Sequence, residues 1–407
     1  MSVGPWRLAL IGHHWILRDN ERGMFMRIGI VGGGPAGLFF ALLMKQHESA
    51  HDIDVWEQNP AGATYGWGVV FSKRALAFIE ESAPDLYRDI SRITETWDEQ
   101  TIVLNGTPVT IDGFGFSALA RIDLLKTLQQ HAARAGANLH FEQRIMAPAD
   151  LSGYDLVVGA DGVNSVVRSW YPDAFHTELE PLQNRYIWYG TPHPFRTLTL
   201  AFREYKGGVY VAHAYRFQPN LSTFIVECDA ATWESARLGM LSDEESQTLC
   251  ARIFEEELEG SPLLSNKSSW GVFRVVHNHG WVADRVALLG DAMRTVHFSI
   301  GSGTRSALED SAVLFRSIVK ASTLRGGLLA YETDRREQLA PLLGVARRSA
   351  KWYESMGEKM VQDPVQFAHD YLMRGGELTE QRLLERSPQF MKTYQAIRPN
   401  RSGEEVT

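Results

Sequence analysis

The stretch RIGIVGGGPAGLFF, residues 27–40, decides the fold of this chain. Its first apolar part predicts a β-strand, and the apolar segment after the glycines predicts a helix. The glycines between them form the pattern G-x-G-x-x-G, in which the first permits a tight turn, the second lets the backbone approach a pyrophosphate, and the third lets the helix pack closely on the strand. The phosphates would face the helix N-terminus, where unpaired N–H groups favour an anion. The predicted binding residues of this turn are Gly32, Gly34, Pro35, Ala36 and Gly37.

An acidic residue follows where such a turn requires one. The stretch IDVWEQ places Glu57 twenty residues after Gly37, at the end of a second apolar strand. A carboxylate at this position takes the ribose hydroxyls of a dinucleotide. Its neighbour Gln58 is included among the predicted contacts. NAD and FAD are both held in this way, so these residues leave the identity of the dinucleotide open.

The composition excludes several classes of protein. With 407 residues the chain is too long for one compact core, which predicts two domains and a helical appendage. The net charge of −8 argues against a nucleic-acid partner, because binding a phosphate backbone needs a basic face. The two cysteines, Cys228 and Cys250, belong to no CxxC or zinc-type cluster, which predicts no disulfide framework and no metal site and fits a reducing cytoplasm.

The longest uncharged stretch, residues 28–44, approaches the length of a membrane span. Five glycines and a proline interrupt it, so we interpret it as buried core and expect no membrane partner. Residues 1–25 lack the features of a signal peptide, since their apolar part is short, contains two histidines and has no small-residue cleavage site. They are predicted to be a poorly packed extension whose deletion leaves folding and activity intact.

Two later stretches repeat the pattern of an apolar strand that runs into a glycine turn with an acid. Residues 155–168 read DLVVGADGVNSVVR, and residues 286–310 read VALLGDAMRTVHFSIGSGTRSALED. A second glycine turn in the latter opens another helix. One mononucleotide needs one such turn, whereas three of them, far apart in sequence, indicate a long ligand with a nucleotide at one end and a polar ring at the other.

These motifs carry a resemblance to a known family. The sequences DGVNSVVR and LLGDA are similar to the DG and GD motifs of group A flavoprotein monooxygenases, which have the p-hydroxybenzoate hydroxylase fold. The resemblance implies FAD as the dinucleotide, with NADH or NADPH and O2 as co-substrates. It implies hydroxylation of an electron-rich aromatic ring through a flavin C4a-hydroperoxide. There is no second G-x-G-x-x-G, so the choice between NADH and NADPH stays open.

The resemblance also implies roles for particular residues. Asp291 would hold the ribityl chain of the flavin, and Asp161 lies in a turn that serves both FAD and NAD(P)H. Arg121, in ALARIDLL, matches the family arginine near the pyrophosphate, although a solvated first-turn arginine is the alternative. The stretch HFSIGSGT departs from the common family pattern, with His297 in the proline region and threonine in place of asparagine. The loop predicted to face the flavin consists of Gly301, Ser302, Gly303 and Thr304.

The stretches GWGVVFS, YIWYGT, STFIVEC and HFSIGSGT narrow the resemblance. They are similar to the branch that contains salicylyl-CoA 5-hydroxylase and the monooxygenase part of anthraniloyl-CoA monooxygenase. The tryptophan hydroxylase of violacein biosynthesis is similar over the same motifs. The implied substrate is an activated arene such as an aryl-CoA thioester. Free tryptophan, another indole or a small phenol is the alternative, and a FAD oxidase or reductase without oxygen insertion is a third.

The expected fold class is α/β, with a Rossmann-like FAD-binding domain of the p-hydroxybenzoate hydroxylase type, a mixed β-sheet substrate domain and C-terminal helices. The FAD-binding domain would take residues 26–182 and 275–345, and the substrate-binding sheet residues 183–274. In GVYVAHAYRF, alternate residues would share one face of that sheet. Residues 346–407 would form a helical region that is either a dimer surface or a docked helix, so both a monomer and a homodimer remain open.

Two histidines are the candidate catalytic residues. His297 directly precedes the predicted flavin loop, and His213 lies in the predicted substrate sheet. A histidine can share the proton of a ring hydroxyl or donate one to an oxygen. A structural role is the alternative for each, as a loop-packing residue for His297 and a sheet residue for His213. The candidate substrate-binding residues are the aromatics Trp67, Tyr186, Trp188 and Tyr215, which strands also use as plain core.

Overall fold

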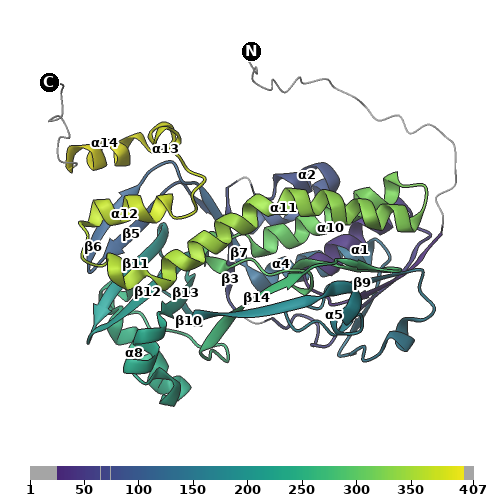
Figure 1. Cartoon of the computed structure of the whole chain (residues 1–407), viewed down its shortest axis with the longest axis horizontal. Coiled ribbons are helices and arrows are strands. Elements are labelled where there is room, and N and C mark those ends of the chain that lie inside the picture. The colour runs from purple at the N-terminus through teal and green to yellow at the C-terminus, as the bar shows by residue number, and fades with distance from the viewer. Residues whose placement is uncertain (1–24, 65, 74, 398–407) are drawn as a thin grey trace, which may run out of the picture.

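The computed structural model describes residues 25–64, 66–73 and 75–397. Two large β-sheets lie end to end along the molecule, and the helix α11 (Leu324–Glu354) runs over both of them (Figure 1). The predicted extension, residues 1–25, falls almost entirely outside the described residues. Among the described residues, no helix combines the length and the apolar character that crossing a membrane requires.

The first sheet carries the nucleotide motifs. It has six strands, of which β1, β2, β8, β9 and β16 run parallel to one another, while β15 is antiparallel to β16. The helix α1 (Pro35–His47) is buried along most of its length and packs against α4 (Arg121–Arg134) and α10 (Gly303–Lys320). The interpretation of residues 28–44 as buried core is therefore confirmed. In spatial order the strands are β15 (Val282–Ala283), β16 (Val286–Leu288), β9 (Leu156–Gly159), β1 (Arg27–Val31), β2 (Asp52–Glu57) and β8 (Asn138–Phe141).

The second sheet has seven strands and is mixed. Its strand β10 is fifteen residues long and pairs with β14 through its first part and with β13 through its last part. Strands from outside residues 183–274 also belong to it, and the division of the chain into the two predicted domains stays a prediction. In spatial order the strands are β14 (Gly271–Asn278), β10 (Thr177–Thr191), β13 (Leu221–Cys228), β12 (Gly208–Gln218), β11 (Leu198–Tyr205), β5 (Gln100–Leu104) and β6 (Thr107–Ile111).

A small third sheet joins the two halves. It consists of β3 (Gly68–Ser72), β7 (Phe116–Ala120) and β4 (Glu95–Trp97), with β7 in the middle and both pairings antiparallel. The end of β7 leads directly into α4, so Arg121 stands at the junction of this sheet and the nucleotide-binding half. Two short helices, α2 (Ala77–Ser82) and α3 (Pro84–Arg92), follow β3 in the chain.

Helices cover both faces of the second sheet. One face lies under an acidic segment that forms the helices α7 (Ala230–Ser235), α8 (Asp243–Ile253) and α9 (Glu255–Leu258). The other face lies under the end of α11, where Trp352 and Tyr353 pack against Phe202 of β11. This is the docked-helix arrangement. The chain ends in α12 (Pro364–Met373), α13 (Glu380–Arg386) and α14 (Pro388–Ile397).

Candidate flavin and substrate site

The first glycine turn has the geometry that its sequence predicts. Gly32 has a φ of +109°, and a Cβ added there would lie 2.2 Å from the carbonyl oxygen of Ala160. A Cβ at Gly37 would lie 2.2 Å from the carbonyl oxygen of Gly32, so the helix lies close against the turn. A Cβ at Gly34 would meet nothing within 4 Å. The turn is thus closed toward the protein and open on the side from which a phosphate would approach.

Glu57 is fixed beside this turn. Its Oε2 atom accepts a hydrogen bond from the backbone N–H of Gly33 at 3.0 Å, and Oε1 accepts from the backbone and the side chain of Asn59 at 2.9 and 2.7 Å. These contacts hold the carboxylate at the C-terminal edge of β2, where a ribose would lie. Gln58 is exposed at the same edge.

The DG motif is tied to the GD motif through an arginine. The carboxylate of Asp161 accepts from Ser165 Oγ at 2.5 Å and from the backbone of Val166 at 2.7 Å, so it caps the turn that begins α5 (Val166–Ser169). Burial raises the pKa of Asp161, and these hydrogen bonds oppose the rise. Arg168 then donates from Nη1 to the carbonyl oxygen of Ala292 at 3.0 Å. The Asp161 carboxylate is engaged within the chain, and its part in cofactor binding stays a prediction.

A buried ionic cluster positions the GD turn, and sequence reasoning missed it. Asp310 is fully buried and accepts from the backbone N–H of Gly290 at 3.1 Å, from Arg294 at 2.8 Å and from Arg335 at 2.7 Å. A buried carboxylate needs such partners, because an unpaired charge is costly inside a protein. In the sequence Asp310 stands beside Glu309 on one helix, and nothing in the pattern distinguishes the buried acid from its neighbour.

Asp291 is the acid of the GD turn, and its side chain is accessible. Desolvation by surrounding protein raises its pKa, an effect that Arg294 and Arg121 oppose. Burial likewise lowers the pKa of Arg121 and raises that of Tyr186, and the charge of Asp291 acts on both groups. These three side chains therefore lie near one another, although they come from β10, α4 and the GD turn.

The predicted flavin loop ends at the start of α10. Gly301 has a φ of +59°, which permits the sharp turn before Ser302. No side chain caps α10, and its first turn contains no acidic residue. The same holds for α1 at Gly34. Two uncapped helix N-termini thus leave N–H groups for a ligand, one at each end of the predicted site. Together with the open Gly34 and the accessible Asp291, these features fit FAD.

Both candidate catalytic histidines contact one aromatic ring. Phe298 lies in the short helix η4 (Phe298–Ile300), just before the flavin loop. Its ring centroid is 4.3 Å from that of His297, 5.4 Å from that of His213 and 5.1 Å from that of Tyr186. Phe273 of β14 closes the cluster against His297. The structure therefore gathers residues from β10, β12 and the flavin loop, as the sequence analysis expected, around a phenylalanine that it did not single out.

His297 is held neutral. Burial lowers its pKa to about 4, and the charges of His213 and Arg374 act in the same direction while Glu227 opposes them. Its Nδ1 atom lies 3.3 Å from the backbone N–H of Ser299, which donates to it, and 2.8 Å from Ser299 Oγ. We therefore assign the ring proton to Nε2. Among the described residues, Nε2 has no hydrogen-bond partner, so it is available to a ligand.

His213 is paired with a buried carboxylate. Its Nε2 atom lies 3.1 Å from Oε2 of Glu227, and Oε1 of Glu227 accepts from Asn184 at 2.7 Å. Burial alone would raise the pKa of Glu227, but the hydrogen bond from His213, the charges of His297 and His213 and the bond from Asn184 together lower it. Sequence reasoning missed Glu227, although an acid within the apolar run STFIVEC was a usable signal. The Nδ1 atom of His213 has no partner among the described residues.

The other aromatic candidates hold the segment that precedes β3. Tyr215 donates to the carbonyl oxygen of Gly68 at 2.9 Å. The Trp188 ring lies against Gly66, and the Trp67 ring lies against Gly190, so close that a Cβ at either glycine would collide with the ring or press on it. Tyr186 alone of the four contacts Phe298. A cavity of about 580 Å³ also opens beside this segment, with Thr64, Trp67 and Ile122 in its wall.

Comparisons with known proteins identify the family of this chain. The profile of a family described as a FAD binding domain matches residues 115–343. The salicyloyl-CoA 5-hydroxylase of a Streptomyces species is 35% identical over 360 residues, covering 86% of this chain and 70% of its own. The 3-hydroxy-4-methyl-anthranilyl-[aryl-carrier protein] 5-monooxygenase of Streptosporangium sibiricum is 34% identical over 354 residues, covering 87% of this chain and 95% of its own.

The solved structures give the same fold. A structure of 2-methyl-3-hydroxypyridine-5-carboxylic acid oxygenase superposes with a TM-score of 0.67 at 17% identity, and covers 89% of this chain and 96% of its own. The chain belongs to the group A flavoprotein monooxygenases. It is a FAD-dependent aromatic hydroxylase, and the resemblance found in its motifs and the expected α/β fold class are confirmed.

Proposed function

We propose that this enzyme hydroxylates the ring of an aryl thioester that carries a ring hydroxyl or amino group, with NADH or NADPH and O2 as co-substrates. The observation that carries the proposal is the pair of histidines at Phe298, each with one ring nitrogen free to meet a ligand beside the flavin loop. The names of two relatives support the thioester, since one acts on salicyloyl-CoA and the other on an aryl group linked to a carrier protein.

The two histidines suit opposite roles. His213 donates from Nε2 to Glu227, which leaves Nδ1 as an acceptor. It would accept the proton of the ring hydroxyl, so that electron density flows into the ring. His297 carries its proton on Nε2 and would donate a hydrogen bond to an oxygen of the substrate. The acid–base work is thereby divided between two groups whose surroundings differ.

Bound FAD, reduced by NAD(P)H, supplies the activation of oxygen, which is the chemistry that the protein side chains lack. The residues that would hold it are the first glycine turn, Glu57, Arg121, Asp291 and the start of α10. Negative charge on the cofactor ring would be stabilised by the N-terminus of α10, whose N–H groups are uncapped. Phe298, Phe273 and Tyr353 keep the substrate side apolar and limit the access of water.

The charge of Glu227 favours a thioester over a free acid. Hydrogen bonds and neighbouring charge lower the pKa of this buried carboxylate, so it is ionised at neutral pH, diagonally across the sheet from His213. A free carboxylate on the substrate would be repelled by it at close range in a site of low dielectric. A thioester carbonyl carries no charge. The ring hydroxyl of such a substrate also offsets the electron-withdrawing thioester at the para position.

A substrate panel tests the proposal. The FAD-loaded enzyme would be given salicylyl-CoA, anthraniloyl-CoA, free salicylate or tryptophan, and NAD(P)H oxidation would be measured together with product mass under 18O2. We expect one of the two thioesters to stimulate NAD(P)H oxidation and to gain one labelled oxygen. If only salicylate or tryptophan gave labelled product, the substrate would be a free acid or an indole and not a thioester. Cofactor oxidation without any labelled product would indicate an oxidase or reductase.

A further inference from the structure

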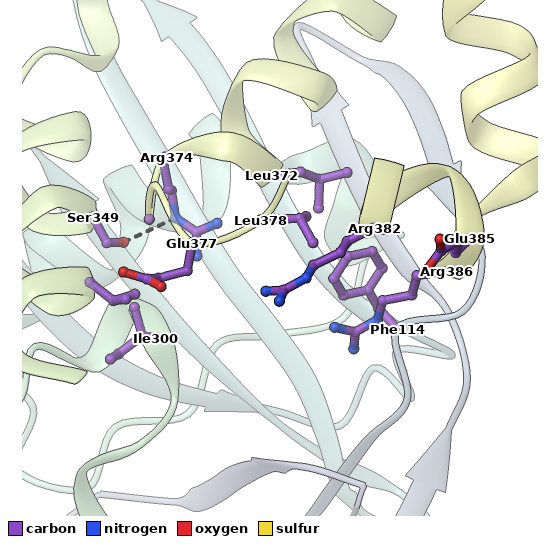
Figure 2. Close-up of a pocket in the computed structure, with 12 residues that line it drawn as sticks. Phe114, Ile300, Ser349, Leu372, Arg374, Glu377, Leu378, Arg382, Glu385 and Arg386 are labelled. Carbon is purple, nitrogen blue, oxygen red and sulfur yellow. Dashed lines mark hydrogen bonds between the residues drawn. The ribbon is translucent and has the colours of Figure 1, made fainter. Parts of the chain in front are cut away.

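A second cavity, of about 590 Å³, lies under the C-terminal helices and outside the flavin site (Figure 2). Its size is within the range of roughly 300–1,000 Å³ that is typical of ligand sites. Its wall is apolar on one side, with Phe114, Leu372 and Leu378, and basic on the other, with Arg374, Arg382 and Arg386. The cavity thus combines an apolar wall with three guanidinium groups in a chain of net charge −8.

Two of these arginines, Arg382 and Arg386, have side-chain N–H groups with no acceptor in the described part of the chain. Figure 2 shows the guanidinium groups of Arg382 and Arg386 pointing toward the open space. The Arg382 side chain has no hydrogen bond or ion pair with any residue in the described part of the chain. Arg386 donates from Nε to the carbonyl oxygen of Gly113 and lies over the Phe114 ring at 3.9 Å, which fixes its plane and leaves both terminal nitrogens free. An oxyanion is the ligand that such groups prefer.

The acidic residues of the wall do not neutralise this pair. Glu377 forms an ion pair with Arg348 at 3.0 Å, and Glu385 accepts from Gln381 at 3.2 Å. Arg374 is fully engaged by other partners, since its three nitrogens donate to Ser349, to the carbonyl oxygen of Tyr371 and to that of Ser299. The charge that remains for a ligand therefore sits at Arg382 and Arg386, toward one end of the cavity.

The opposite end of the cavity reaches η4, which directly precedes the flavin loop. Ile300 and Ser349 line it there, and Ile300 belongs to the same short helix as Phe298. Ser349 Oγ lies 2.8 Å from Ser299 Oγ, which in turn lies 2.8 Å from Nδ1 of His297. A ligand in this cavity would therefore extend from a basic end to the layer of residues directly behind the candidate catalytic histidine.

We propose that this cavity binds the phosphorylated pantetheine arm of the thioester substrate, with the phosphate at Arg382 and Arg386 and the sulfur end at Ile300. The inference rests on the proposed function and deepens it. The arm is long and narrow, with two amides, methyl groups and one phosphate, so it matches a cavity with an apolar wall and one basic end. CoA and a carrier protein both present this arm, and its shared chemistry is what the cavity would recognise.

Direct binding is the decisive test, because it needs no turnover. The FAD-loaded protein would be titrated by calorimetry with CoA, 4′-phosphopantetheine and unphosphorylated pantetheine. The double variant Arg382→Gln/Arg386→Gln would be compared with a control, Arg252→Gln/Arg325→Gln, which removes two exposed charges elsewhere. We expect the cavity variant to bind 4′-phosphopantetheine more weakly than the parent by about tenfold or more, and the control variant to bind it as the parent does. Unphosphorylated pantetheine should bind to both variants with equal affinity. Equal binding of phosphopantetheine by both variants, or no binding by the parent, overturns the proposal.

Two further arms separate this inference from the proposed function and identify the source of the arm. If the parent hydroxylates an aryl-CoA and the cavity variant does so with the same KM, the function stands and the cavity assignment fails. A rise in KM of about tenfold with kcat retained supports both, because the arginines would bind without touching the reacting atoms. CoA binding more tightly than 4′-phosphopantetheine, with the excess lost in the cavity variant, would indicate CoA as the source, whereas equal binding indicates a carrier-linked arm.

Discussion

The Nε2 atom of His213 lies 3.1 Å from Oε2 of Glu227, with both side chains almost fully buried. The register of β12 and β13 produces this contact, because Val211 pairs with Glu227 and His213 pairs with Ile225, which makes the two side chains diagonal neighbours on one face. A carboxylate at that nitrogen fixes the ring tautomer and leaves the other nitrogen to accept a proton. Glu227 is therefore a positioning residue in the proposed reaction.

Replacing Glu227 with glutamine tests this role. The amide keeps the size of the side chain and its contact with Asn184 but removes the charge. We expect kcat to fall by about tenfold or more with KM little changed, because His213 loses the carboxylate that fixes its ring tautomer. Stopped-flow and steady-state kinetics measure both parameters. Glu204→Gln, on the neighbouring strand β11, is the matched control. A variant with the parent kcat would remove Glu227 from the mechanism.

Replacing His297 with glutamine should uncouple the reaction. The variant keeps an amide that can donate near the flavin loop but loses the imidazole and its bond to Ser299. We expect NAD(P)H oxidation to continue while hydroxylated product per NAD(P)H falls by about tenfold. The ratio of product to consumed cofactor measures this directly. His47→Gln, at the exposed end of α1, controls for the loss of a histidine as such. Full coupling in the His297 variant would assign it to packing alone.

The buried His297 should also make the protein sensitive to acid. Its pKa is about 4 in the folded protein against 6.5 in an unfolded chain, so between these values only the unfolded state binds the proton. The free energy of unfolding therefore falls as the pH drops through this window, by up to roughly 3 kcal/mol. Chemical denaturation of the parent and of His297→Gln between pH 4 and 7 would show it, with the smaller slope in the variant. Glu227, whose pKa is lowered, adds its own loss only at more acidic pH. Equal slopes would contradict the assignment.

Asp310 should be the most sensitive position in the nucleotide-binding half. Its replacement by asparagine removes the carboxylate that pairs with the buried Arg294 and leaves Arg335 with Glu309 as its remaining ion-pair partner among the described residues. We expect a loss of about 3–5 kcal/mol in the free energy of unfolding. FAD should also be retained less well, because Asp310 holds the backbone of Gly290 beside Asp291. Denaturation curves and flavin fluorescence after dialysis measure the two effects. Replacing the neighbouring Glu309, which is the more exposed of the two carboxylates that pair with Arg335, provides the comparison and should cost less.

Two glycines of the first turn should respond in opposite ways to alanine. At Gly32 the positive φ and the contact with Ala160 make any side chain costly, and we expect a loss of roughly 2 kcal/mol or more in stability. At Gly34 the φ is −79° and the space is open, so alanine should change stability by less than about 1 kcal/mol. The methyl group would instead occupy the space through which the phosphate approaches, and would weaken FAD binding by about tenfold. Unchanged FAD affinity in Gly34→Ala would place the pyrophosphate elsewhere.

The sequence by itself determined the nucleotide-binding half of the protein. The turn at residues 32–37 allows one backbone conformation, because Gly32 has a positive φ and Gly37 packs closely against the turn. Both requirements are local. The order of the DG and GD motifs after it then indicated FAD and the monooxygenase family. Alternation along β12 likewise placed His213 on the same face as Tyr215. Each of these motifs depends on residues within a few positions of one another, and their order can be seen in the sequence itself.

The tertiary structure alone decided which residues meet. Glu227 reaches His213 through the register of two strands, and Phe298 joins both histidines because a loop of the nucleotide-binding half lies under the second sheet. Asp310 is buried between Arg294 and Arg335. The packing of helices brings these residues together, and no local sequence pattern predicts the contact. The basic cavity combines α13 with a flavin loop some eighty residues earlier in the chain. Such contacts depend on register, packing and burial between distant segments, and these are properties of the folded chain and not of any short stretch within it.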